Sequence, residues 1–487
     1  MADSAVEESL SMGSVRTVSP RQSRALRPAR RRRRADRLGR DLRSSLGDAV
    51  GSGVMVGTGE TYLPAFVLAA GLGEVVAGLV ASVPQLAGGI TQLICPRGVR
   101  LFGSHRQWVV TCAAIQGLSF VPLIIAAWLG GVSAPVVLAV ATLYWSAGLA
   151  SGPPWNTWMG TIVPCRVRSR YFAGRARLQQ AAVLTGFLAS GAAIQYGATS
   201  ENALAGFGLL FALAVGCRFA SVAFLARTSE PEPMPSNVRH IPLPVLLRRF
   251  CRGAEAQRLI YISLVQGAAY FAAPYFAPYM LRVLKFSYAE YVTLISTAYF
   301  AKVLSLTLWG RVASRFGIRT LLWIGGICIV PSAVAWVISN NFWFLILVQL
   351  LSGTAWAAYE LAVFLICFNS IRAEERTSVL TIFNLTTTAA MVIGSLLGAA
   401  VLILFGATRP VYYVLFAGSS LLRLGTLFFL RRVPARLIEP QTVRRPRLSL
   451  PVPNFLSLRP LWSTLSQTTD SPDEWIEPTD QPLRRPA

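Results

Sequence analysis

The chain has 487 residues, of which 53% are hydrophobic and 14% are charged, and its mean hydropathy is +0.50. This composition is too apolar for a water-soluble protein, and it excludes a disordered chain, a collagenous repeat and a disulfide scaffold. The formal net charge of +24 would fit a nucleic-acid-binding protein. However, the arginines lie between long apolar runs, which favours a membrane protein that binds no nucleic acid.

The first 45 residues form a basic tail with an arginine run at residues 30–34. The tail lacks an apolar core followed by a small-residue cleavage site, so we identify no signal peptide. An arginine-rich, serine-containing leader could also be an organelle transit sequence. Acidic residues such as Glu7, Asp36 and Asp41 argue against this alternative, because transit sequences contain few of them. We expect a cytoplasmic tail over residues 1–45.

About twelve apolar segments follow in two sets of six, each long enough for a membrane-spanning helix. The first set is expected at residues 47–71, 74–95, 107–130, 133–163, 176–197 and 202–227. The second set is expected at residues 259–281, 287–310, 319–338, 341–370, 377–405 and 409–431. The sequence therefore predicts an all-α polytopic membrane protein, with one six-helix bundle at 46–228 and another at 258–431.

Polar sequence separates the two sets and follows the second. Residues 229–257 contain Pro231 and Pro233, and the amphipathic stretch 245–251 predicts a helix on the membrane surface. Residues 432–487 are rich in proline, arginine, serine and threonine, a composition that cannot bury a core. We expect a cytoplasmic linker and a disordered cytoplasmic C-terminal tail, although either tail could instead bind a partner.

Basic residues fall in every second gap between the segments. The gaps at residues 97–106, 166–177, 248–258, 311–319 and 372–376 each contain two or more of them. In the alternate gaps we find Arg282, Lys285 and Arg409. Because positively charged loops stay on the cytoplasmic side, this pattern places both termini in the cytoplasm and requires an even number of spans.

A similar motif follows the second segment of each set. It reads RGVRLFGSHRQW from residue 97 and WGRVASRFGIRTLLW from residue 309. The shared glycines and basic residues are Gly103, Arg106, Gly310, Arg315, Gly317 and Arg319. Two matching sets of six spans indicate an internal repeat.

Taken together, the twelve spans, the cytoplasmic termini and this motif resemble the major facilitator superfamily of secondary transporters over residues 46–431. The resemblance implies two bundles that rock around a central cavity lined by helices 1, 4, 7 and 10. The chain departs from the family's motif at its aspartate, where Arg100 and Ser314 stand. This departure removes the carboxylate with which the family latches a neighbouring helix terminus.

Glu60 is the clearest ionisable residue within an expected span. It lies between Gly59 and Pro64 near the middle of the first segment, where a charged residue costs about 2.5–3.5 kcal/mol on insertion scales. Burial penalises the charged form of a carboxyl, so Glu60 could exchange a proton near neutral pH. The alternative is a structural carboxyl bonded to a neighbouring helix. The cavity position implied by the resemblance favours proton coupling.

Lys302 and Glu360 form a second pair of candidates. They lie about eight and ten residues from the cytoplasmic ends of their segments, or roughly 12 and 15 Å at 1.5 Å per residue. Opposite charge at similar depth predicts an ion pair, which is either a permanent bridge or one that opens when substrate or a proton arrives. Arg218 and Arg423 are expected to extend towards the membrane surface without a functional role.

Four polar or aromatic residues are candidates for the substrate cavity. Trp155 and Asn156 follow two prolines in the fourth segment, and Gln266 and Tyr270 share one face of the seventh. A polar and aromatic face suits a substrate that has both polar and aromatic groups. Bonding between helices together with an aromatic belt at the membrane surface explains the same residues equally well.

The sequence contains no metal-binding His/Cys spacing and no phosphate-binding glycine loop followed by lysine. We therefore expect no enzyme activity, no cofactor and no metal, and secondary rather than ATP-driven transport. Proton-coupled transport of a small-molecule solute is the leading hypothesis. An uncoupled facilitator is the alternative within this class, and a sensor or enzyme on the same scaffold is the alternative from another class. The expected partners are the solute, protons and the lipid bilayer, and we expect a monomer. Arginine outnumbers lysine, which is typical of a GC-rich bacterial genome and favours a bacterial inner membrane.

Overall fold

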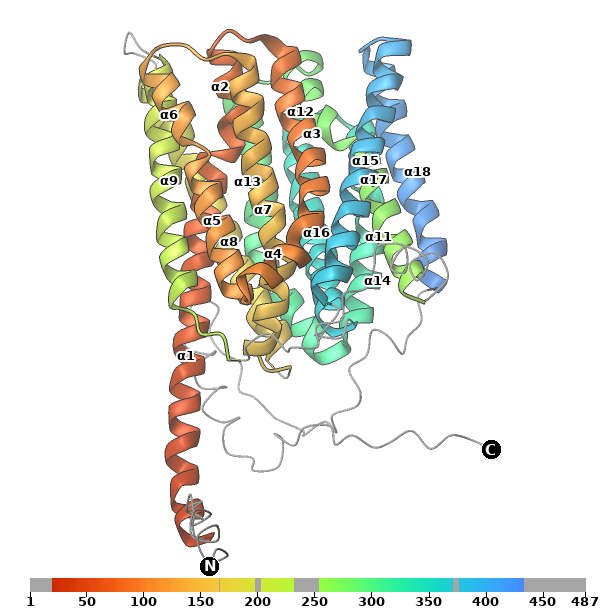
Figure 1. Ribbon diagram of the computed structural model, residues 1–487. Helices are drawn as coiled ribbons and strands as arrows, with labels where there is room; N and C mark the ends of the chain where they lie inside the picture. Colours follow the sequence, from red (N-terminus) through yellow and green to blue (C-terminus); the bar gives the residue numbers. More distant parts are fainter. Residues whose placement is uncertain (1–19, 166, 198–202, 232–253, 371–375, 433–487) are drawn as a thin grey trace, which may run out of the picture. The chain divides into compact units, whose positions relative to one another are not determined.

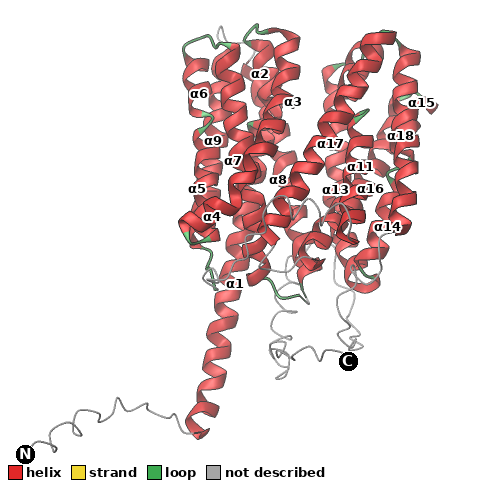
Figure 2. Ribbon diagram, turned by 45° about the vertical axis from the view of Figure 1, so that its right-hand side comes forward, coloured by secondary structure: helices red, strands yellow, loops and turns green. Residues whose placement is uncertain are grey.

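The computed structural model describes residues 20–165, 167–197, 203–231, 254–370 and 376–432. Within these ranges the regular structure is helical throughout (Figure 2). The described residues from Asp41 onward form one compact unit. The surface helix expected at 245–251 and the C-terminal tail lie outside the described residues.

Six helical segments make up the first bundle (Figure 1). In chain order they are α1 (Pro20–Thr58) with η1 (Glu60–Tyr62) and α2 (Leu63–Ala69); α3 (Gly73–Thr91) with η2 (Gln92–Ile94) and α4 (Cys95–Phe102); α5 (His105–Leu118) with α6 (Val121–Trp128); α7 (Ala134–Ile162); α8 (Arg168–Gly197); and α9 (Ala203–Arg227). Helix α1 begins inside the expected N-terminal tail. Its interruption before Pro64 follows from the missing N–H of proline.

Six further segments make up the second bundle (Figure 1). They are α11 (Ala254–Tyr270) with η3 (Ala273–Tyr275), α12 (Phe276–Pro278) and η4 (Tyr279–Val283); α13 (Tyr288–Phe316); α14 (Ile318–Cys328) with α15 (Pro331–Ile338); α16 (Phe342–Ser370); α17 (Arg376–Phe405); and α18 (Arg409–Arg432). Nine of the described segments are long and apolar enough to cross a membrane. The segments led by α1, α3 and α8 complete the set, so the predicted all-α architecture is confirmed.

Each bundle has an aromatic core of its own. In the first bundle the rings of Phe120 and Phe211 stack 5.4 Å apart, and both side chains are fully buried. In the second bundle Phe276 stacks on the buried Phe416 at 4.4 Å. Aromatic residues bury large apolar areas, so each core stabilises its own bundle. Val292 and Ile295 of α13 in the second bundle also pack against the first core.

The bundles contact each other at the end that carries the arginine-rich loops, which we call the basic end. The hydroxyls of Thr157 in α7 and Thr377 in α17 lie 2.8 Å apart, and Arg177 Nη1 in α8 donates to Thr307 Oγ1 in α13 at 2.9 Å. A Cβ added at Gly310 in α13 would lie 2.5 Å from Ala173 Cβ, so α8 and α13 are packed closely there. The basic end is therefore closed.

Candidate functional site

Glu60 lies where the first segment is interrupted. Tight packing of α1 against α8 precedes the break, since a Cβ at Gly57 would lie 2.3 Å from the Val183 carbonyl oxygen. The helix then tightens into η1, and the Glu60 side chain is half-buried. Its Oε2 accepts a hydrogen bond of 2.7 Å from Tyr144 Oη in α7. Within the described ranges no cationic side chain lies at ion-pair distance from Glu60.

Lys302 and Glu360 are brought together by the packing of α13 against α16. Lys302 Nζ donates to Glu360 Oε1 at 2.7 Å, and the exposed fractions of the two side chains are 19% and 45%. An exposure of 45% is large for a carboxylate well inside a membrane-spanning segment. Charged side chains in such segments face the bundle interior or water rather than lipid.

Two tyrosines connect these charges across the bundle boundary. Tyr270 in α11 interacts electrostatically with both Glu60 and Glu360, and Tyr299 in α13 interacts with Lys302 and with both carboxylates. We call the group formed by Glu60, Tyr144, Tyr270, Tyr299, Lys302 and Glu360 the central site. Both tyrosines therefore lie near both carboxylates.

Sequence reasoning missed two members of the central site, Tyr144 and Tyr299. Tyr299 precedes Lys302 by three residues, and this spacing on a helix places both on one face, so a signal was present. Tyr144 carried no signal of that kind, because its partner Glu60 is 84 positions away in the chain. The predicted Gln266 lies one helical turn from Tyr270 and is half-buried.

The other two cavity candidates lie nearer the basic end. Twelve residues separate Asn156 from Tyr144 along α7, or roughly 18 Å. The ring of Trp155 lies under the Arg175 guanidinium, 4.3 Å from its carbon. Trp155 Nε1 and Asn156 Oδ1 are buried without a hydrogen-bond partner among the residues that the structure describes. The candidates named from sequence are thus divided between two levels of the molecule.

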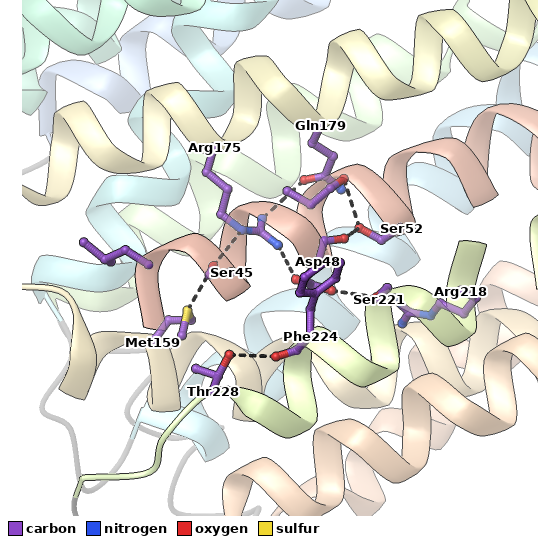
Figure 3. A network of polar contacts seen from close by, with 12 residues as sticks. Ser45, Asp48, Ser52, Met159, Arg175, Gln179, Arg218, Ser221, Phe224 and Thr228 are labelled. Atoms are coloured by element: carbon purple, nitrogen blue, oxygen red, sulfur yellow. Dashed lines mark hydrogen bonds and ion pairs between the residues drawn. The ribbon is translucent and has the colours of Figure 1, made fainter. Parts of the chain in front are cut away.

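Near the basic end the structure also contains a buried charge network that the sequence did not reveal (Figure 3). Asp48 in α1 is 4% exposed, and its Oδ2 lies 2.7 Å from Arg175 Nη2 in α8. Its Oδ1 accepts a 2.7 Å hydrogen bond from Ser221 Oγ in α9, which in turn accepts from Arg218 Nη1 at 3.0 Å. Asp48 therefore joins guanidinium groups from two other helices, binding Arg175 directly and Arg218 through Ser221.

The expectation that Arg218 and Arg423 extend to the membrane surface is wrong. They are 7% and 3% exposed, respectively. Arg423 Nη1 donates to the Ile329 carbonyl at 3.0 Å and to Ser332 Oγ at 2.7 Å. Both arginines thus find partners inside their own bundle, which is an alternative to reaching water.

The first loop motif lacks the family's aspartate, but the carboxylate of Glu230 lies beside it. Gly103 ends α4 at φ +62°, a conformation that favours glycine. Glu230, which follows α9, accepts hydrogen bonds from His105 N at 2.9 Å and Ser104 Oγ at 2.5 Å. Burial alone would raise the pKa of Glu230, but these bonds outweigh it and hold the pKa below its usual value. Glu230 therefore caps α5 as an anion.

In the second loop motif the residue at the aspartate position contacts the other bundle. Ser314 Oγ accepts a hydrogen bond of 3.4 Å from Arg170 Nε in α8. Gly317, at φ +91°, makes the turn between α13 and α14. The contact between bundles at this position is therefore a bond to a neutral hydroxyl rather than an ion pair.

Comparison with known proteins identifies the fold. Residues 259–469 match the family model of the Major Facilitator Superfamily. A comparison with curated protein sequences finds no match. The E. coli fucose:proton symporter FucP is similar with a TM-score of 0.63 and 13% identity, over 81% of this chain and 98% of that one.

Two further solved structures are similar at the same level. The proton:xylose symporter XylE has a TM-score of 0.63 and 12% identity, over 82% of this chain and 96% of that one. A bacterial homologue of the iron transporter ferroportin, in an outward-facing state, has a TM-score of 0.60 and 14% identity, over 82% and 99%. Such low identities show the fold alone. The family match over residues 259–469 and the membrane-spanning segments agree with this fold, which is that of the major facilitator superfamily of transmembrane transporters.

Proposed function

We propose that this protein is a secondary active transporter that moves a small-molecule solute across a bacterial plasma membrane and is driven by protons. The observation that carries this proposal is the environment of Glu60. Its carboxyl lies at a helix break inside the membrane and is bonded to a neutral hydroxyl, and no described cation lies at ion-pair distance from it. Such a group can change its charge without breaking an ion pair.

Alternating access follows from the way in which the bundles are held. Each bundle keeps its own aromatic core, whereas hydroxyl and glycine contacts join the bundles at the basic end. Two rigid bodies joined by such contacts can rock about a site between them. If the basic end faces the cytoplasm, as its arginines favour, the closed contacts correspond to an outward-facing state.

In this mechanism protonation of Glu60 is coupled to movement of the solute. A neutral carboxyl costs less to enclose in the membrane than a charged one. Protonation therefore lowers the free energy of the occluded intermediate, in which the site is closed on both sides. The hydrogen bond from Tyr144 holds the Glu60 carboxyl towards α7 in the conformation described. The Lys302–Glu360 pair, on the opposite bundle, supplies polar contacts to the same space.

An uncoupled facilitator remains the second candidate, and one observation favours it. The hydrogen bond between Tyr144 and Glu60 is what a purely structural carboxyl would form with a neighbouring helix. A facilitator would equilibrate its solute but would not concentrate it. The two candidates therefore differ in their response to an imposed pH gradient.

The test uses the purified full chain in lipid vesicles loaded with a mixed pool of metabolites and drugs. We expect at least one solute to accumulate beyond equilibrium when a pH gradient is imposed, and only to equilibrate when the gradient is dissipated. Glu60→Gln should abolish accumulation but leave solute exchange, because the carboxamide keeps the shape and cannot take up a proton. The matched control is Glu290→Gln, since glutamine can still cap the start of α13.

Accumulation that persists in Glu60→Gln would remove this carboxyl from the coupling mechanism. Equilibration without accumulation in the wild type would establish the facilitator instead. If no solute crosses wild-type vesicles of verified orientation and folding, transport itself is contradicted.

A further inference from the structure

We propose that the transported solute is an organic cation and that Glu60 is its anionic partner in the central site. This inference rests on the proposed function, because it names the substrate class of the same site. It is carried by the charge and the side-chain chemistry of the residues that form the central site.

The charge of the central site is the first part of the argument. Lys302 is compensated by Glu360 at 2.7 Å, so this pair contributes no net charge. Glu60 is bonded to the neutral Tyr144 hydroxyl, and no described cation lies at ion-pair distance. The site therefore carries one uncompensated negative charge when its carboxylates are ionised. In a medium of low dielectric constant such a charge attracts a cation and repels an anion.

The aromatic residues are the second and independent part. Tyr270 and Tyr299 are only partly buried, and both interact electrostatically with Glu60 and Glu360, so they lie near both carboxylates. Aromatic rings stabilise organic ammonium groups through their faces, and rings grouped near a carboxylate are a known way to bind them. A hard metal ion instead requires about six oxygen ligands. Here one of the two carboxylates already binds Lys302, so the arrangement favours an organic cation.

The consequence for coupling follows from charge balance. A proton and a cationic solute each neutralise Glu60, so the two exclude each other at this carboxyl. Release of one proton accompanies binding of one monovalent cation, and no net charge enters the site. The geometry therefore favours exchange of the cation against a proton over their movement together.

The experiment compares probes that share a shape and differ in charge, using equilibrium binding to the purified full chain in detergent. The first pair is tetraphenylphosphonium and tetraphenylborate. The second is benzyltrimethylammonium and its neutral isostere neopentylbenzene. We expect the wild type to bind at least one of the cations more tightly than its matched partner, by about tenfold or more, the factor that 1.4 kcal/mol represents.

Variants then locate the effect. Glu60→Gln should reduce cation binding by a factor on the order of ten and remove the preference over the matched probe. Glu60→Asp keeps the charge and should keep the preference. Glu290→Gln, at the start of α13, should bind as the wild type does.

Several results would overturn the inference. They are equal or tighter binding of both matched partners, no binding of either cation, and undiminished cation binding by folded Glu60→Gln. If Glu60→Gln does not fold, the wild-type preference between the matched probes still decides. Because binding is measured without a gradient, a failure here leaves the accumulation assay free to support or contradict proton-coupled transport of another class of solute.

Discussion

The two bundles share one architecture but compensate their buried charges at different levels. In the sixth segment of each bundle an arginine, Arg218 or Arg423, is buried. In the first bundle Asp48 serves as the counterion through Ser221, whereas Arg423 in the second bundle binds a backbone carbonyl and a hydroxyl. The first bundle therefore uses a carboxylate at its basic end where the second uses neutral acceptors.

The difference is reversed in the central site. There the second bundle compensates its carboxylate with Lys302, whereas Glu60 of the first bundle has only a neutral hydroxyl as partner. Carboxylates that are paired stabilise the fold, and the carboxylate that is left unpaired can exchange its proton. This comparison favours a structural role for Asp48 and the proposed functional role for Glu60, two acidic residues twelve positions apart in the first segment.

Replacing Asp48 should have the largest effect on stability. Asp48→Asn leaves Arg175 and Arg218 without their shared counterion in a buried setting, and breaking a buried ion pair costs about 3–5 kcal/mol. The midpoint of thermal unfolding in detergent should fall sharply. Asp36→Asn, at an exposed position, is the control and should unfold as the wild type does. Equal stability of the two variants would show that the network does not hold the first bundle together.

Neutralising the Lys302–Glu360 pair should have a smaller effect. Because Glu360 is 45% exposed, water screens the pair, and each of Lys302→Met and Glu360→Gln should cost about 1 kcal/mol. The double variant should recover most of this loss. Denaturation of all three variants measures the coupling, and transport by the double variant separates a structural bridge from one that opens during the cycle. A double variant less stable than both single variants would contradict the pairing.

Restoring a carboxylate to the second loop motif should slow transport slightly. Ser314→Asp places an anion beside Arg170 of the other bundle, and an exposed ion pair stabilises the closed basic end by up to about 1 kcal/mol. That corresponds to roughly a fivefold lower rate if opening of this end limits the cycle. Ser314→Asn, which adds no charge, is the control. A Ser314→Asp variant that transports faster than the wild type would contradict the expectation that opening of the basic end limits the cycle.

The Glu230 cap should have the smallest effect. Glu230→Gln should destabilise the first bundle by about 0.5–1 kcal/mol, because a charged cap at α5 is replaced by a neutral one. Since the folded protein holds the pKa of Glu230 below its usual value, the contribution is present above that usual value. It is lost as the pH falls through the lower, folded-state pKa. Unfolding measured against pH should therefore show the two proteins converging in acid; a constant difference would contradict the cap.

The sequence predicts positions along helices well and contacts around them poorly. Apolar length and arginine spacing were sufficient for the helical segments, and equal depth with opposite charge was sufficient to predict Lys302 beside Glu360. Rotation about each helix axis is decided by packing, which single-sequence periodicity does not report when a helix is apolar on most faces.

The contacts that were missed illustrate this limit. Asp48 and Arg175 are 127 positions apart. Asp48 lies at the start of the segment expected at 47–71, and Arg175 lies in the basic gap at 166–177, so nothing in the sequence linked them. Arg218 and Arg423 were expected to extend towards the membrane surface but are buried, because position along a helix does not show whether a partner lies inside the bundle. Glu230, which follows the sixth segment, caps the start of α5. Neither loop motif predicted this contact.

The most direct test of the central claim asks which carboxyl of the molecule takes up a proton. Infrared difference spectra of the purified protein in lipid, recorded as the pH is lowered across the neutral range, detect the carbonyl stretch of a protonated carboxyl. We predict a band in the wild type that is absent from Glu60→Gln and retained in Glu360→Gln, because Glu360 is paired with Lys302 at 2.7 Å whereas Glu60 is bonded to a neutral hydroxyl. A band that survives in Glu60→Gln, or that disappears in Glu360→Gln alone, would contradict the assignment of proton coupling to the first bundle.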